Sequence, residues 1–330
     1  MLFFNCKQSL DPEFLYMALK TPLFNRVIRE NTTGSVRQNL SFEVLSTLPI
    51  PLPTMAEQQA LVEAYNSKIK AAEEKERRAV QLNKEIEDYL LSELGIKKQQ
   101  HTDKADLLLK FVRFKGVEEW GYDKIIGSNF GLLKSNLYDN KKLNELLEIN
   151  PSTSFLSLND NDELSFIPME CISDEFGEWK ERRKCKKKDS KGYTKFQSGD
   201  LIWARITPCM QNGKSAIVDN LESGLGCGST EFHVLRNKES GLNLQFVHLI
   251  LRQPMVLDDA KRSFTGSAGQ QRVPKSYLEN LSIPFPPISI QNAIVEHANQ
   301  LKEQMKQLKQ EAKELRENAL VEFEKEIFEN

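Results

Sequence analysis

The chain has 330 residues, of which 28% are charged and 39% hydrophobic, and its formal net charge is -2. This length allows about two structural units. The small net charge excludes a uniformly basic nucleic-acid binder, so any contact with phosphates must come from a local patch. The five cysteines form no C-x-x-C pair, which argues against a zinc site and indicates a reducing compartment. No apolar run is long enough to span a bilayer, and the predicted location is the cytoplasm.

A long element occurs twice in the chain, in the same order and with nearly the same spacing. A repeat of this kind indicates two related structural units. Its matching segments are residues 14–22 and 246–254, 33–35 and 265–267, 48–53 and 281–286, and 58–63 and 291–296.

Each copy is predicted to fold as a helix, a turn, an extended segment and a second helix. In the first copy, residues 14–28 have apolar side chains at helical spacing, which tolerates Pro22 only near a kink or an end. The Thr-Gly-Ser segment 33–35 predicts a turn. Alternate prolines over 48–53 remove backbone donors, so this segment is predicted to be an edge strand or extended chain.

Two long helices follow these extended segments. Thr54 and Glu57 have the spacing of a capping box, in which two side chains satisfy free backbone amides at a helix start. The first helix is therefore predicted over 54–94 and the second over 289–328. The second carries an apolar seam that alternates steps of four and three residues, as in a coiled coil: Ile294, Ala298, Leu301, Met305, Leu308, Ala312, Leu315 and Ala319.

The first helix has a comparable apolar stripe, which Lys68 and Lys75 interrupt. Two narrow stripes of similar length can bury each other. The sequence therefore predicts that the helices, each about 55–60 Å long, pair antiparallel within the chain. An alternative is that each helix packs on its own domain or on another chain.

Between the copies, the sequence favours an α+β domain. The glycine-rich segment 224–228 lacks the spacing of a dinucleotide-binding loop and is predicted to be a flexible turn. A helix is predicted over 244–257. Short strands are predicted over 164–167, 200–206, 215–218 and 230–235.

No segment has the pattern of an active site. The phosphate-binding loop G-x-x-x-x-G-K-[ST] is absent, and the residues after Asn150-Pro151 lack the signature of amino-methylating enzymes. Asp174, Glu178 and Lys180 faintly resemble a nuclease site, but these acids are too close in sequence to come from separate strands. The four histidines show no ligand spacing. The chain is predicted to be non-catalytic and to bind no metal.

Basic side chains are concentrated over residues 180–195, where only Glu181 and Asp189 are acidic. Such a density of positive charge attracts phosphates without sequence preference. A solvated basic loop is the alternative. The predicted DNA-binding residues in this segment are Lys180, Arg182, Arg183, Lys184, Lys186, Lys187 and Lys188.

Base recognition requires side chains with paired donors or acceptors, such as arginine on guanine and glutamine or asparagine on adenine. The Thr-Gly-Ser loop with its glutamine occurs in both copies, so the sequence favours a role in shaping the fold or holding phosphate over a role in selecting bases. The candidate DNA-binding residues are Arg205, Gln211, Asn212, Lys214, Arg262, Thr265, Gln270, Gln271 and Arg272.

At this point the chain resembles the specificity (S) subunits of type I restriction-modification enzymes. Segments 199–206 and 228–235 are similar to strands of that family's target-recognition domains. The other matching residues are 265–267 with Gln270, 281–291 with the helix after it, their earlier copy over 33–58, and Arg113-Phe-Lys-Gly116 with Trp120.

The resemblance implies an α+β fold in which target-recognition domains of mixed short strands and helices are joined by two long antiparallel coiled-coil helices. It implies recognition of a bipartite double-stranded DNA sequence. Methylation with S-adenosylmethionine would belong to modification subunits, and cleavage with ATP and Mg to a restriction subunit. This chain would then hold no cofactor of its own.

The first copy departs from the family pattern because far fewer residues precede it than precede the second. Another polypeptide, either a second copy of this chain or another S subunit, would then supply the missing part. Alternatives are a truncated S fragment or a coiled-coil interaction scaffold without useful DNA specificity. The predicted division is 1–53 as the C-terminal part of a first recognition domain, 54–94 and 287–330 as spacer helices, 95–129 as a linker and arm, and 130–286 as a complete recognition domain.

Overall fold

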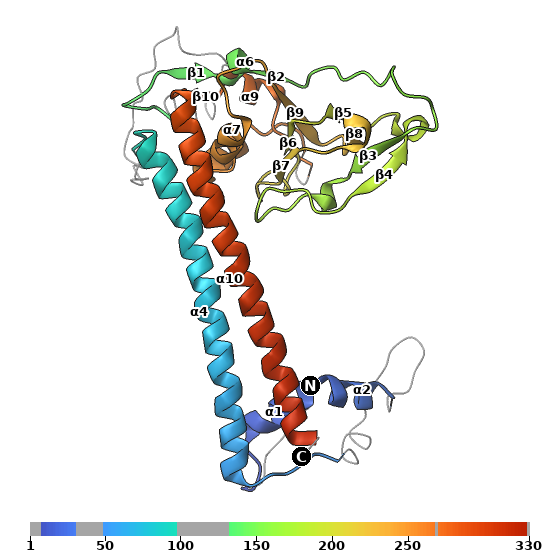
Figure 1. Cartoon of the computed structure of the whole chain (residues 1–330), viewed down its shortest axis with the longest axis vertical. Coiled ribbons are helices and arrows are strands. Elements are labelled where there is room, and N and C mark those ends of the chain that lie inside the picture. The colour runs from blue at the N-terminus through green and yellow to red at the C-terminus, as the bar shows by residue number, and fades with distance from the viewer. Residues whose placement is uncertain (1–7, 31–48, 98–131, 268–269, 329–330) are drawn as a thin grey trace. The chain divides into compact units, whose positions relative to one another are not determined.

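The computed structural model describes residues 8–30, 49–97, 132–267 and 270–328, and it divides into two compact units (Figure 1). The first unit comprises residues 1–84 with 301–330, and the second comprises residues 85–300. Two long helices, α4 (Met55–Glu93) and α10 (Ile288–Phe328), each contribute to both units. Within the described residues, no helix is both long and apolar enough to cross a membrane.

The two long helices are confirmed, and in the first unit they pack against each other antiparallel. The lysines that interrupt the stripe of α4 face acids of α10: Lys75 Nζ lies 2.6 Å from Glu311 Oε2, and Lys68 pairs with Glu322. The order of these partners runs in reverse along α10. Half-exposed ion pairs of this kind contribute little stability, so they mainly set direction and register. Small side chains fill the buried seam: Ala72, Ala79, Ala312 and Ala319 are almost fully buried.

Enlarging one of these alanines is expected to strain the helix pair. We predict that Ala79→Leu lowers the free energy of unfolding of the first unit by about 2 kcal/mol, because extra methylene groups in a close-packed seam force side chains and backbone apart. Urea unfolding followed by circular dichroism measures this. The neighbouring Val80 is 68% exposed, so Val80→Leu serves as control and should leave stability unchanged. Equal effects of both substitutions would contradict the packing described.

The predicted helix over 14–28 is in fact two helices, α1 (Pro12–Lys20) and α2 (Pro22–Glu30). The break falls at Thr21, because Pro22 lacks an amide hydrogen and is tolerated only in the first turn of a new helix. The same correction applies to 244–257, which forms α7 (Leu244–Leu251) and α8 (Pro254–Arg262) with Pro254 opening the second. The predicted turn at 33–35 lies outside the described residues.

The second unit holds the α+β domain, which is confirmed. One sheet has the strand order β2-β9-β6-β7 and the other β4-β3-β8-β5 (Figure 1). Helix α7 packs against β7. The strands are β2 (Leu147–Ile149), β3 (Glu163–Ile167), β4 (Arg183–Lys186), β5 (Thr194–Gln197), β6 (Asp200–Ala204), β7 (Ser215–Val218), β8 (Leu225–Gly228) and β9 (Phe232–Asn237). Short helices are α6 (Leu143–Leu146), α9 (Lys275–Asn280), η2 (Met169–Cys171), η3 (Lys187–Ser190) and η4 (Glu222–Gly224).

Segment 224–228 is not the flexible turn that its glycines predict, because most of it forms β8 between β3 and β5. Glycine is needed there for close approach: a Cβ at Gly228 would lie 2.1 Å from the Ile167 carbonyl oxygen. The same strand brings Cys227 Sγ to 3.5 Å from Cys185 Sγ, and burial raises the pKa of both thiols. Cysteines far apart in sequence thus meet as free thiols.

The proline-rich segment of the second copy is an edge strand, as predicted. β10 (Ser282–Pro284) pairs antiparallel with β1 (Asn140–Lys142) in a two-stranded sheet. In the first copy, residues 49–53 form no strand with the described part of the chain. The chain then enters α4 through the predicted capping box, in which Thr54 N donates to Glu57 Oε2 at 2.8 Å and Glu57 N donates to Thr54 Oγ1 at 3.4 Å.

A buried glutamine holds the start of each long helix, and the two glutamines occupy matching positions of the repeat. Gln58 Oε1 accepts from the backbone N of Asp11 at 2.8 Å, and its Nε2 donates to the carbonyl oxygens of Ser9 and Pro53. Gln58 is fully buried. In its described part, the sequence repeat is therefore also a repeat of structure.

Gln291 repeats this arrangement in the second unit. Its Oε1 accepts from Asn243 N at 2.8 Å, and its Nε2 donates to Gly241 O at 3.1 Å and Pro286 O at 2.8 Å. Asn243 caps α7, as Asp11 caps α1. Each glutamine thus ties a helix cap to the proline segment before a long helix.

Candidate nucleic-acid interface

Three loops, two of which carry predicted DNA-binding residues, meet where β6 ends and β9 begins. Thr207 N donates to Gln271 O at 3.0 Å, and Val273 N donates to Arg205 O at 2.9 Å. Arg205 N also donates to the carbonyl oxygen of Glu231 at 2.9 Å. Segments 205–214 and 229–231, together with 264–267 and 270–273, therefore form one cluster, which we call the loop cluster.

The repeated Thr-Gly-Ser loop is closed by its own backbone. Thr265 N donates to Arg272 O at 3.0 Å, and Arg272 N donates to Thr265 O at 2.9 Å. Gly266 has a φ of 106°, a conformation that favours glycine, in agreement with the predicted turn. Thr265 and Gln270 are exposed. The loop is thus held firmly at its base while polar side chains face solvent.

A carboxylate between two guanidinium groups joins the three segments. Glu231 accepts from Arg272 Nε and Nη2, with the closest contact at 2.7 Å, and from Arg205 Nε at 3.3 Å. The hydrogen bonds from Arg272 lower the pKa of the Glu231 carboxyl. Sequence reasoning missed Glu231. It could be found only by pairing the start of the predicted strand 230–235 with the end of its antiparallel neighbour.

The turn after β6 carries three more candidates, which differ in their hydrogen bonds and in their exposure to solvent. Gln211 Oε1 accepts from Thr207 Oγ1 at 2.7 Å, and Asn212 is exposed. Lys214 Nζ donates to Met169 O at 3.2 Å, so its charge is directed toward that carbonyl. Asn212 is therefore the candidate in this turn with the greatest access to a ligand.

Arg252 of α7's C-terminal cap anchors this turn, and no sequence pattern predicts this role. Its Nη1 donates to Gly213 O, and its Nη2 donates to Asp174 O at 2.7 Å and Glu175 O at 2.9 Å. Burial lowers the pKa of Arg252 to about 10. A guanidinium with several donors in one plane can hold backbone carbonyls from separate segments, and here it fixes the turn.

The basic segment is divided between two ends of a strand instead of forming one loop. Arg183 opens β4 beside Phe166 of β3, whereas Lys186 closes β4 beside Glu163. These ends are about 10 Å apart. Because Ser229 N donates to Ile167 O, the Arg183 end lies on the side of the loop cluster.

Carboxylates neutralise part of this basic segment. Arg183 pairs with Glu170 and Glu181, Lys184 with Glu163 and Glu222, and Lys187 with Asp160. Lys180, Lys186 and Lys188 are exposed, and Arg182 is exposed beside the ring of Trp179. Arg262 lies exposed in the last turn of α8. The surface available to phosphates is therefore smaller than the sequence suggests.

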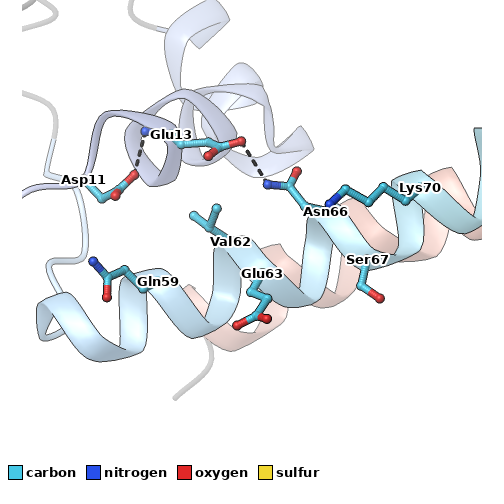
Figure 2. Close-up of a pocket in the computed structure, with 8 residues that line it drawn as sticks. All are labelled: Asp11, Glu13, Gln59, Val62, Glu63, Asn66, Ser67 and Lys70. Carbon is cyan, nitrogen blue, oxygen red and sulfur yellow. Dashed lines mark hydrogen bonds between the residues drawn. The ribbon is translucent and has the colours of Figure 1, made fainter.

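A hollow of about 500 Å³ in the first unit lies elsewhere, between α1 and the start of α4 (Figure 2). Figure 2 shows Glu13 accepting from Asn66 Nδ2 at 2.9 Å. The matching residues of the second unit make the same contact, since Asn299 Nδ2 donates to Gln245 Oε1 at 3.4 Å. The hollow is thus part of the repeated helix packing, and no predicted DNA-binding residue lines it. In the described part of the chain, no cluster of three or more His, Cys, Asp or Glu could hold a metal ion.

The chain thus combines an α+β domain, whose loops gather at one end of a sheet, with two long helices. The family described as "Type I restriction modification DNA specificity domain" matches residues 136–317, which is more than half of the chain. The chain belongs to this family.

Two curated proteins of Escherichia coli are similar to part of the chain. The type I restriction enzyme EcoEI specificity subunit is 45% identical and the EcoAI specificity subunit 43% identical, each over 154 residues. Each match covers 46% of this chain and only 26% of the relative's length.

A solved structure described as the basis of complex assembly and conformational transition of the type I R-M system has the same fold. It aligns with 95% of this chain and 70% of its own, with a TM-score of 0.55 and 17% identity. At that identity the likeness concerns the fold alone, and it agrees with the predicted small sheets and two long helices.

Proposed function

We propose that this chain recognises a specific sequence of double-stranded DNA as the specificity subunit of a type I restriction-modification complex. The observation that carries the proposal is the loop cluster, where Arg205 and Gln211 of one segment come together with Thr265, Gln270 and Arg272 of another. Side chains with paired donors and acceptors are the ones that read base edges. Membership in the DNA specificity family supports this use of the loops.

The catalytic steps belong, in this proposal, to other subunits. Modification subunits would bring S-adenosylmethionine, and a restriction subunit would bring ATP and Mg, as the family resemblance implies. The chain itself would place those subunits at the recognised DNA sequence. It would do so in the cytoplasm. Helices α4 and α10 set the spacing of a bipartite site, and another S polypeptide or a second copy of this chain is a further proposed partner.

Footprinting tests the proposal. The full chain, assembled with modification subunits, is expected to protect a defined DNA sequence from cleavage, and addition of excess unrelated duplex should not remove that protection. Modification subunits alone serve as the control and should protect no defined sequence. Assembly without any preferred sequence would favour the alternative of an interaction scaffold.

The exposed lysines of the basic segment are expected to contribute phosphate contacts. We predict that the double substitution Lys186→Gln with Lys188→Gln weakens binding to any duplex about tenfold and reduces the slope of log affinity against log salt by about two, because each contact releases a counterion. Fluorescence anisotropy at several salt concentrations measures both quantities.

A matched control removes two exposed lysines outside this segment. Lys84 lies on α4 and Lys313 on α10, and both are exposed. Lys84→Gln with Lys313→Gln should leave affinity and salt slope unchanged. An unchanged slope in the Lys186 and Lys188 variant would exclude these residues from the DNA surface.

A further inference from the structure

The two arginines of the loop cluster share one carboxylate but are bound differently. Glu231 takes hydrogen bonds from Arg272 at both Nε and Nη2, at 2.9 Å and 2.7 Å, and from Arg205 only at Nε. The Glu231 side chain is 20% exposed, so solvent competes weakly for it. This asymmetry separates the roles of the two arginines.

Arg272 is engaged on every side. Its remaining nitrogen, Nη1, donates to Gln270 O at 2.9 Å, and its backbone is bonded in both directions to Thr265. A guanidinium fixed at all three nitrogens has little freedom to turn toward a ligand. Arg272 therefore holds the repeated loop closed.

Arg205 keeps its outer nitrogens available. Within the part of the chain that the structure describes, neither Nη of Arg205 has a hydrogen-bond partner, and its side chain is 35% exposed. Its backbone is fixed at both sides, through Glu231 O and Val273 N. The residue thus presents two parallel donors from a rigid strand end.

We infer that Glu231 is a positioning residue that orients Arg205 to read one guanine in the major groove. A carboxylate bound at Nε fixes the plane of the guanidinium, so that the two Nη groups can donate together to guanine O6 and N7. Arg272 binds the same carboxylate from the opposite segment and holds it in place. The inference rests on the proposed function, which it refines to a single base contact.

Selection from randomised duplex DNA tests the inference with the full chain assembled with modification subunits. The wild-type complex should enrich one sequence, and each of its positions is then changed singly. At one guanine the wild type is expected to prefer guanine by about tenfold to a hundredfold over other bases. Arg205→Lys, which keeps the charge but loses the paired donors, should reduce that preference to about twofold at this position alone.

Glu231→Gln should reduce the preference at the same position, and Glu231→Asp should restore part of it. The control is Glu222→Gln, which removes an exposed partner of Lys184 in the same unit and should change no base preference. Arg205→Lys keeps the test independent of any effect of Glu231→Gln on folding, which the unfolding temperature reports.

Two outcomes would overturn the inference, and they are distinguishable. If the wild type enriches a sequence and Arg205→Lys keeps every preference, Arg205 reads no base although the proposed function stands. If the wild type enriches no sequence at all, the proposed function fails and the inference fails with it.

Discussion

Replacing Asp200 with asparagine is expected to lower the free energy of unfolding of the second unit by about 3 kcal/mol. Asp200 is 1% exposed, and its two oxygens accept from Arg236 Nε at 2.8 Å and Arg236 Nη2 at 2.7 Å. It also accepts from Gln197 N at 2.9 Å. The hydrogen bonds that Arg236 donates to Asp200 raise the pKa of the Arg236 guanidinium, which keeps its charge at neutral pH.

The cost arises because the substitution removes only one of the two charges. Arg236, whose side chain is 19% exposed, would keep its charge beside a neutral amide, and a buried charge without a partner is strongly destabilising. Arg236 also donates to Thr153 Oγ1 at 2.8 Å, so β6, β9 and the chain after β2 would all loosen.

Urea unfolding of the full chain measures this loss, with Asp219→Asn as the matched control. Asp219 follows β7 and is exposed, so its substitution should change stability little. A loss in Asp200→Asn no greater than in the control would show that the pair does not hold the sheet together.

Gln291→Leu is expected to have a comparable effect, also about 3 kcal/mol. Leucine has nearly the same size as glutamine but forms no hydrogen bonds. The backbone N of Asn243 and the carbonyl oxygens of Gly241 and Pro286 would therefore lose their hydrogen-bond partner. Each unsatisfied buried group costs about 1–3 kcal/mol, offset in part by the apolar side chain.

Gln300→Leu controls for the chemistry of the substitution, since Gln300 is exposed on the same helix. Gln58→Leu provides a second comparison and should destabilise the first unit by a similar amount. Hydrogen exchange would locate each effect: protection should fall near residues 241–243 in one variant and near residues 9–11 in the other. Loss of protection at both places in either variant would contradict the conclusion that each glutamine stabilises only its own unit.

The periodic spacing of apolar residues predicts the long helices well. Capping residues, which are a local feature, predict where a helix begins. The seam from Ile294 to Ala319 and the capping pair Thr54 and Glu57 depend only on neighbours in the chain, so they are readable. The helix breaks at Pro22 and Pro254 also depend on neighbouring residues. They were not predicted because apolar residues continue at helical spacing on both sides of each proline. Strand β8 was missed because its glycines serve a contact with distant strands.

The candidate site was predicted only in part. Arg205 and Arg272 were identified by residue type, but Glu231, which separates their roles, depends on strand pairing that a single sequence does not reveal. The basic segment was found by composition, yet composition cannot tell that Lys184 and Lys187 face acids contributed by other segments. The sequence shows where basic residues are concentrated, whereas the acids that neutralise them are brought close only by the tertiary structure.

The paired glutamines have a practical consequence for engineering. Gln58 bonds only to segments of the first unit and Gln291 only to segments of the second. A chimera joined at residue 53 or 287 would separate a helix start from the cap it holds. Crossover points inside the long helices, near residues 84 and 300 where the units divide, would keep each glutamine with the segments it bonds and allow the two units to be exchanged separately.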